Sequence, residues 1–243
     1  SKIQANGITG TFTITNGVTY IGAVLGKTSV AGATVTVNAS GMNATQLNDV
    51  GNNADKVDTL LNVTVFADAS LSDEALTDLM SGGSNIIVIA TGMSPTQLNI
   101  VAQYAANIAA NGVGGTVVLN SLVTDSTLDA LLEKTDEGAT VQANAASMTT
   151  VHLTALSDNI AVVDTITNLT LTSAQAAGEI TNLLTKTTGA LAVATDMDAA
   201  KLNALAATAS IANIAADGIS GNMLLTSDVS DANISSLMTK TPA

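Results

Sequence analysis

A repeat of about 52 residues runs along the chain and constrains the fold more than any other feature. In one pattern an apolar residue is followed by two more at +3 and +4 and by Lys-Thr at +6 and +7. The lysines of this pattern are Lys27, Lys134, Lys186 and Lys240, and a fifth copy has Gly82 in the place of the lysine. Successive copies, Gly82 included, are 55, 52, 52 and 54 residues apart.

A second pattern lies between the copies of the first. It is a methionine followed by apolar residues at +5 and +8, and it begins at Met42, Met93, Met148 and Met197. Two interleaved patterns with one shared period indicate alternating half-repeats of about 26 residues, nine of which fit in the 243 residues.

Each half-repeat begins as a strand and continues as a helix. The opening run is rich in Thr, Val and Ile, as in residues 33–37, which favours a short strand. Ile180, Leu183 and Leu184 are spaced so that all three lie on one face of a helix, and Ser72 is a suitable N-cap residue.

A strand–helix unit of this size cannot bury its apolar face alone, but stacked units can. The sequence therefore predicts an α/β protein, a right-handed β/α solenoid with a parallel sheet on one side and short helices on the other. We expect about nine coils in a single solenoid over residues 1–243 without true capping units, which suggests stacking of copies or a longer array.

The strand–helix order and repeat length resemble leucine-rich repeats, although the regular Leu/Asn pattern of that family is absent. The Ala/Thr/Asn/Asp-rich, Arg-free composition more closely resembles the repeat regions of very large bacterial, often cyanobacterial, cell-surface proteins of the surface-layer and adhesin type. This resemblance covers the whole chain and implies an extracellular or cell-surface location. It implies no particular site residues.

Composition argues against several classes of function. All seven basic residues are lysines, aromatic residues make up 2%, and the net charge is −13, so we expect no binding to nucleic acid. No run of 18 apolar residues is present, so we expect no membrane span. The absence of cysteine excludes disulfides and thiolate zinc ligands.

Acidic residues gather at the predicted turns, which raises calcium as a possible cofactor because calcium prefers carboxylate and carbonyl oxygens. The alternative is that these carboxylates are solvated and cap helices. Neither the EF-hand loop nor the Gly-rich nonapeptide of calcium-binding β-helices is present. The candidate ligands are Asp73, Asp125, Asp136, Asp196 and Asp228.

His152 is the single histidine, so any histidine-based site requires it. Gln46, Gln97 and Lys201 occupy the equivalent positions of other repeats, so we expect an exposed polar position on a helix. Because no catalytic partner for His152 is evident, and Cys and Arg are absent, we expect that the chain is not an enzyme.

The outward positions of two predicted strands are apolar. Ile87 and Ile89, and likewise Leu191 and Val193, would be exposed on the open sheet face and are candidate interface residues. We therefore expect a structural protein that self-associates or joins other surface components in a surface layer, filament or adhesin stalk. The alternative is a solenoid module that binds a protein or glycan through its sheet face.

Overall fold

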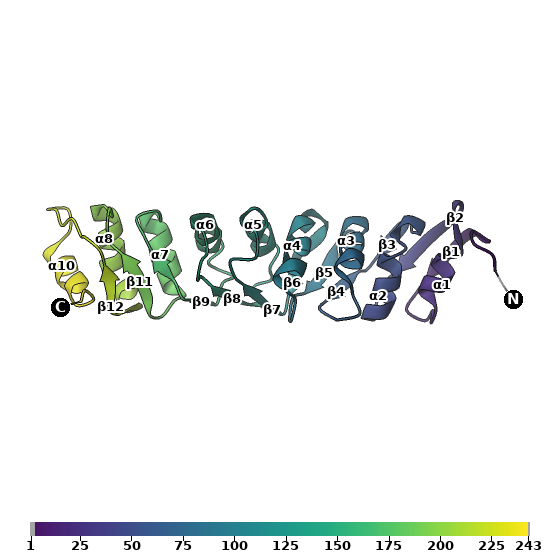
Figure 1. Ribbon diagram of the computed structural model, residues 1–243, viewed down its shortest axis with the longest axis horizontal. Helices are drawn as coiled ribbons and strands as arrows, with labels where there is room; N and C mark the ends of the chain where they lie inside the picture. The colour runs from purple at the N-terminus through teal and green to yellow at the C-terminus, as the bar shows by residue number, and fades with distance from the viewer. Residues whose placement is uncertain (1–2, 243) are drawn as a thin grey trace. The chain divides into compact units, whose positions relative to one another are not determined.

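The computed structural model describes residues 3–242 (Figure 1). These residues form two compact units. The first unit comprises the residues up to Val117 together with Glu133–Ala139. The second comprises Val118–Leu132 together with the residues from Thr140 onward. The prediction of one continuous solenoid over residues 1–243 stays a prediction.

The first unit contains six complete strands. Its elements in chain order are β1 (Ile8–Ile14), α1 (Ile21–Leu25), β2 (Thr28–Asn38), α2 (Ala44–Gly51), η1 (Ala54–Lys56), β3 (Thr59–Leu61), β4 (Thr64–Phe66), α3 (Asp73–Gly82), β5 (Ile86–Ile89), α4 (Pro95–Gln103), η2 (Ala105–Asn107) and β6 (Ile108–Gly114). The next strand, β7 (Thr116–Leu119), begins in this unit and ends in the second.

The second unit has a similar order of strands and α-helices. They are α5 (Asp125–Glu133), β8 (Thr140–Asn144), α6 (Thr150–Asp158), β9 (Thr165–Thr167), β10 (Thr170–Leu171), α7 (Ala177–Thr185), β11 (Ala190–Val193), α8 (Ala199–Ala206), α9 (Thr208–Ile211), β12 (Ile214–Ser220) and α10 (Asp231–Met238). From α2 to β6, each α-helix and each strand has a counterpart in the second unit whose first residue is 104 to 106 positions later, whereas the short helix η1 has none.

The strands pair in parallel, which confirms the predicted α/β class with parallel strands. In the first unit β2 lies between β1 and β3, and β5 lies between β4 and β6. The second unit repeats this arrangement around β8 and β11. The continuous sheet expected from the sequence is not found, because the described residues form four sheets of three strands.

The division between sheets has a local cause, a residue in the left-handed conformation. Asn62 (φ 54°) separates β3 from β4, and Asn168 (φ 54°) separates β9 from β10. Because the backbone bends at this residue, β3 pairs back with β2 whereas β4 pairs forward with β5. The same conformation recurs every 53 residues, at Asn62, Gly115, Asn168 and Gly221.

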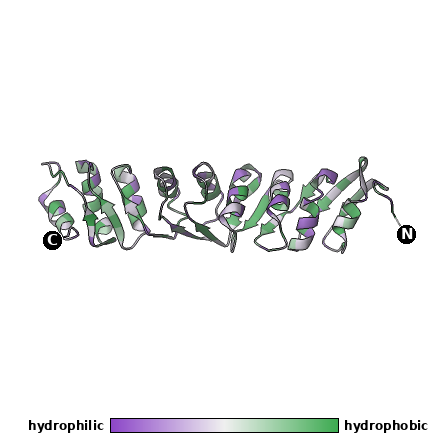
Figure 2. Cartoon of the chain, viewed as in Figure 1, coloured by the Kyte–Doolittle hydropathy of each residue, from purple (hydrophilic) through white to green (hydrophobic). Residues whose placement is uncertain are grey.

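The core of each unit lies between its strands and its helices. Val35 and Val37 of β2 and Leu183 and Leu184 of α7 are fully buried, and the helices of each unit pack on their neighbours, as α2 does on α3 (Figure 1). Figure 2 shows hydrophobic residues along the strands and mixed hydrophobic and hydrophilic residues on the helices. Ser72 caps α3 as expected, because its hydroxyl accepts a hydrogen bond from the Ala75 N–H.

The repeat pattern predicts a strand over residues 222–226 and a lysine in the last turn of each helix, and both predictions are wrong. Residues 222–226 are not a strand, although their equivalents β4 and β10 are. Those equivalents pair with the strand of the following coil, and the described chain supplies no such strand after Gly221. The lysine of the Lys-Thr pattern lies beyond the last helical turn, and the threonine, as at Thr187, donates its hydroxyl to the helix carbonyl four residues earlier.

Candidate functional site

The outward side of the small sheets carries exposed side chains that alternate with buried ones along the strands. In β5 the side chains alternate, with Ile86 and Val88 fully buried and Ile87 and Ile89 each 42% exposed. Thr64 lies beside Ile87 in the neighbouring strand and Phe66 lies beside Ile89. The outward side of this sheet therefore carries branched and aromatic side chains next to a threonine.

The second unit repeats the same surface. Leu191 of β11 is 49% exposed and Val193 is 36% exposed, while the alternate residues Ala190 and Ala192 are buried. Thr170 lies beside Leu191 and Ser220 beside Val193. All four candidate interface residues therefore point outward, from equivalent strands of the two units.

The other sheet of each unit is mostly polar on its outward side, although Val30 of β2, Leu61 of β3 and Val118 of β7 are exposed there. Thr13, Thr36 and Thr59 lie in register on β1, β2 and β3. In the second unit Gln142 lies beside Thr165. Polar and apolar outward surfaces thus follow one another along the chain.

Charge is almost absent from the strands. Of the residues in β1 to β12, Asp217 alone carries a charged side chain, and it lies at an irregular position of β12 with φ 54°. The whole chain has a net charge of −13, and apart from Asp217 its acidic residues lie on helices, turns and loops.

The five candidate calcium ligands lie on different turns, and the structure gives most of them a local role. Asp73 is the first residue of α3 and Asp125 the first of α5, where a carboxylate interacts favourably with the helix dipole. Asp136 accepts a hydrogen bond from the Gly138 N–H (2.7 Å). Asp196 occupies a left-handed turn with φ 63°, and the Asp228 carbonyl accepts from the Asn203 amide (3.0 Å).

The five aspartates are not brought together. Within residues 3–242 no three His, Asp or Glu side chains converge so that they could hold a metal ion. Two of the aspartates line shallow depressions: Asp196 one of about 500 Å³ with Asp198, and Asp125 one of about 180 Å³ with Asp129 and Asp158. A role for calcium stays a hypothesis for experiment.

His152 corrects the sequence-based expectation of an exposed residue, because it is only 3% exposed. Its Nε2 lies 2.5 Å from the Val123 carbonyl oxygen and must donate to it, since a carbonyl only accepts. Its Nδ1 contacts the Thr149 hydroxyl (3.0 Å) and the Asp125 carboxylate. Asp125 in turn accepts a hydrogen bond from the Thr149 hydroxyl (2.8 Å).

The burial of His152 follows from its place in the helix. It is the third residue of α6, and its side chain completes a capping box with Thr149. Gln46 occupies the same place in α2 and donates to the Asn16 carbonyl (2.8 Å), and Lys201 in α8 donates to the Ser173 carbonyl (2.6 Å). This position therefore ties the start of a helix to the backbone about 28 residues earlier, a contact that polarity alone did not predict.

Comparison with known proteins identifies no family. No family model matches the chain, and no curated protein matches it. Among solved structures, the chain is similar to one described as a mandelate racemase/muconate lactonizing protein from Herpetosiphon aurantiacus, with 11% identity and a TM-score of 0.19. The match covers 89% of this chain and 54% of that chain, so this chain spans about half of its length. A TM-score of 0.19 carries no argument about fold or activity.

The prediction that the chain is not an enzyme is corrected as an exclusion: one solved structure in the comparison is described as a mandelate racemase/muconate lactonizing protein, although its TM-score of 0.19 assigns no activity to this chain. The exclusion also rested on the lack of a partner for His152, and the structure places Asp125 and Thr149 in contact with its ring. No activity is assigned to this chain on either ground. No helix within residues 3–242 is both long enough and apolar enough to cross a membrane.

Proposed function

We propose that this chain is a structural repeat protein that self-associates at the cell surface, as part of a surface layer, filament or adhesin stalk. In this proposal the two units form a single right-handed β/α solenoid of about nine coils. The function lies in packing against other copies or other surface components.

The contacts between successive coils support the solenoid. Side chains of one coil repeatedly bind the backbone of the coil before it. Asn107 donates to the Met80 carbonyl and Asn213 to the Leu184 carbonyl, both at 2.8 Å. Such nearest-neighbour contacts are the interactions that stabilise solenoids.

The observation that carries the functional proposal is the pair of apolar outward surfaces. Ile87 and Ile89 of one unit, and Leu191 and Val193 of the other, leave 36 to 49% of each residue exposed. Large apolar side chains that stay exposed together more often mark an interface than an accident. Their recurrence at equivalent positions in both units supports a repeated role.

The test is the size of the purified chain in solution, measured by light scattering over a wide concentration range and checked by negative-stain electron microscopy. We expect assemblies larger than the 24.1 kDa chain, and their mass should rise with concentration. A chain that stays monomeric at every concentration contradicts the proposal. The same measurement with calcium or a chelator tests the acidic turns, since calcium-dependent growth would support calcium bridging.

The second candidate function is the binding of a glycan or protein partner, and the polar outward surfaces favour it. The row of Thr13, Thr36 and Thr59 and the pair Gln142 and Asn144 present hydroxyl and amide groups to solvent. Saturable binding to one glycan on an array by the monomeric chain would support this function over self-association.

A further inference from the structure

We infer that His152 forms a proton-dependent contact between two coils of the second unit, and that uptake of one proton by its ring stabilises that unit. The neutral ring caps helix α6, whereas the protonated ring pairs with the Asp125 carboxylate at the start of α5. Asp125, Thr149 and His152 all belong to the second unit. The inference does not depend on self-association or on any bound partner.

One nitrogen of the ring has the same partner in both charge states. Nε2 lies 2.5 Å from the Val123 carbonyl oxygen, which only accepts, so Nε2 carries a proton whether the ring is neutral or charged. The residue is 3% exposed, so water does not compete for this contact. The charge of the ring therefore depends on whether Nδ1 carries a second proton.

Nδ1 has two partners that require opposite charge states. The Thr149 N–H lies 3.3 Å from Nδ1 and donates to it only when Nδ1 carries no proton. The Asp125 carboxylate also contacts Nδ1, and because both atoms are acceptors their contact requires a proton between them. The neutral ring thus completes the capping box of α6, and the protonated ring exchanges that hydrogen bond for an ion pair with Asp125.

The charged groups around the ring favour the protonated state. Within their bounds, helices α5, α6 and α7 contain no lysine or arginine. Lys134 and Lys186 follow the C-terminal ends of α5 and α7, whereas the ring lies at the N-terminal end of α6. The carboxylates on these three helices are Asp125, Asp129, Glu133, Asp158 and Glu179.

Burial of the ring opposes its charge, but the ion pair is buried on one side only. A charged group loses hydration when it is buried, and a nearby opposite charge compensates for that loss. The Asp125 side chain is 39% exposed and keeps part of its hydration, so the pair does not bear the full cost of burying two charges. Asp129 and Asp158 line the same shallow depression as Asp125 and add to the attraction.

The stability of the chain should therefore rise as the pH falls. The folded chain places the proton of His152 against Asp125, a partner that the unfolded chain lacks, so folding favours proton uptake. Histidine gains its charge between about pH 8 and about pH 5, and His152 is the single histidine. The gain in stability should be complete at the acidic end of this range and lost as the pH rises through it.

The first unit has no equivalent device. Gln46 takes the place of His152 in α2, where it accepts from the Asn43 N–H (3.1 Å) and donates to the Asn16 carbonyl (2.8 Å). Glutamine makes both contacts in one uncharged state. Residues 15–25, which include α1, contain no acidic side chain that a histidine at position 46 could pair with. The dependence on protons therefore belongs to the second unit alone.

The first experiment follows the imidazole ring of the full chain by nitrogen NMR between about pH 8 and about pH 5, with a chelator present so that no metal ion competes for Asp125. Because the chain has a single histidine, its ring signals need no further assignment. We expect protons on both ring nitrogens at the acidic end and on Nε2 alone at the basic end. A ring that stays neutral down to about pH 5 overturns the inference.

The second experiment compares the urea midpoints of variants at about pH 8 and about pH 5.5, again with the chelator. We expect the wild type to have the higher midpoint at the lower pH. His152→Gln, which copies the first unit, and Asp125→Asn, which removes the paired charge, should lose this gain. Asp129→Asn is the matched control and should keep it, because the Asp129 carboxylate accepts from Asn159 and not from the ring.

The chain's amino terminus also titrates in this range, and His152→Gln corrects for it because that group is unchanged. Equal wild-type midpoints at the two pH values overturn the inference. A gain that survives in folded Asp125→Asn or folded His152→Gln overturns it as well. If either variant does not fold, the NMR titration of the wild type decides. The proposed function stands in each case, since it does not depend on His152.

Discussion

At the scale of single residues, one backbone position decides where each sheet ends. The residue in the left-handed conformation is Asn62 in one repeat and Gly115 in the next. Contacts with the neighbouring coil determine whether asparagine or glycine occupies the position. Asn62 donates its amide to the Asn38 side chain (3.0 Å). At Gly115 a Cβ atom would lie 2.5 Å from the Thr91 hydroxyl, which accepts the Thr116 N–H, so glycine is required there.

Gly115→Ala should therefore destabilise the fold. Alanine in the left-handed conformation costs about 1 to 2 kcal/mol, and the close contact with Thr91 adds to that cost. Gly114→Ala is the matched control, because nothing lies within 4 Å of the Cβ that it would add. Urea unfolding of both variants measures the difference. Equal stabilities would show that the bend imposes no strain.

His152→Gln should be tolerated much better than His152→Ala. Glutamine at the equivalent Gln46 already caps its helix at the Asn43 N–H and donates to the Val18 carbonyl. Alanine leaves a cavity and an unpaired Val123 carbonyl, at a cost of about 2 to 3 kcal/mol.

The two His152 variants are compared by chemical denaturation. If His152→Gln and His152→Ala lose similar amounts of stability, the imidazole ring itself is required. That outcome would direct attention to its contacts with Asp125 and Thr149, which glutamine does not fully reproduce.

At the scale of elements, the sequence predicted the strands that begin each half-repeat and the buried helix faces. Alternation of Thr and Val, as in residues 33–37, identified β2, and the spacing of Ile180, Leu183 and Leu184 identified α7. The strands β3, β6, β9 and β12 were missed. Sequences such as that of β6, rich in Ala, Asn and Gly, have low strand propensity and become strands because β5 pairs with them.

Side-chain contacts between coils could not be predicted from the sequence either. The outward direction of Ile87 follows from alternation within β5, so it could be inferred from the sequence. The partner of His152 could not, since the Val123 carbonyl is 29 residues away and its position depends on how two coils stack. Local periodicity determines which face a residue occupies, whereas stacking determines what it touches.

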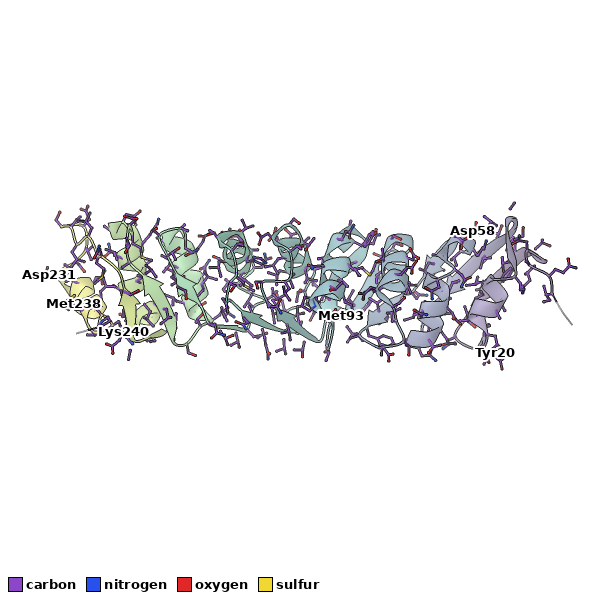
Figure 3. All side chains as sticks on the ribbon, in the orientation of Figure 1. Tyr20, Asp58, Met93, Asp231, Met238 and Lys240 are labelled. Carbon is purple, nitrogen blue, oxygen red and sulfur yellow. The ribbon has the colours of Figure 1, made fainter. Side chains whose placement is uncertain are left out.

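Asp164 should be required to hold β8 in place. Its carboxylate accepts the N–H of the fully buried Val141 (2.7 Å), as Asp58, labelled in Figure 3, does for Val35 in the first unit. Asp164→Ala leaves that N–H unpaired and should cost about 1 to 3 kcal/mol. Asp164→Asn keeps an accepting oxygen and should cost less.

Thermal unfolding of the two Asp164 variants makes the comparison. Asp58→Ala, at the same place in the first unit, should lose a similar amount of stability. If the Asp164→Ala variant is as stable as the wild type, water replaces the carboxylate at the Val141 N–H.

At the scale of the whole molecule, the true period is about twice the one that the Lys-Thr pattern indicates. The outward residues alternate from one 52-residue repeat to the next, so that Thr36 is followed by Ile87, Gln142 and Leu191. The two compact units correspond to this longer period of 104 to 106 residues. The outward apolar pair recurs with this period, as Ile87 and Ile89 in the first unit and Leu191 and Val193 in the second.

Salt should strengthen the assembly of this chain. The proposed attraction comes from the exposed apolar residues Ile87, Ile89, Leu191 and Val193 and does not depend on charge, while the net charge of −13 on each copy opposes the approach of two copies. Raising NaCl from about 10 mM to about 1 M shortens the Debye length from about 30 Å to about 3 Å and screens that repulsion.

Sedimentation velocity across this range should therefore detect larger assemblies at high salt. A variant in which Ile87, Ile89, Leu191 and Val193 are all replaced by aspartate should stay monomeric throughout, which separates screening from general salting-out. Binding of a basic partner to the acidic turns would have the opposite dependence, so an assembly that dissolves at high salt would contradict association through these apolar residues.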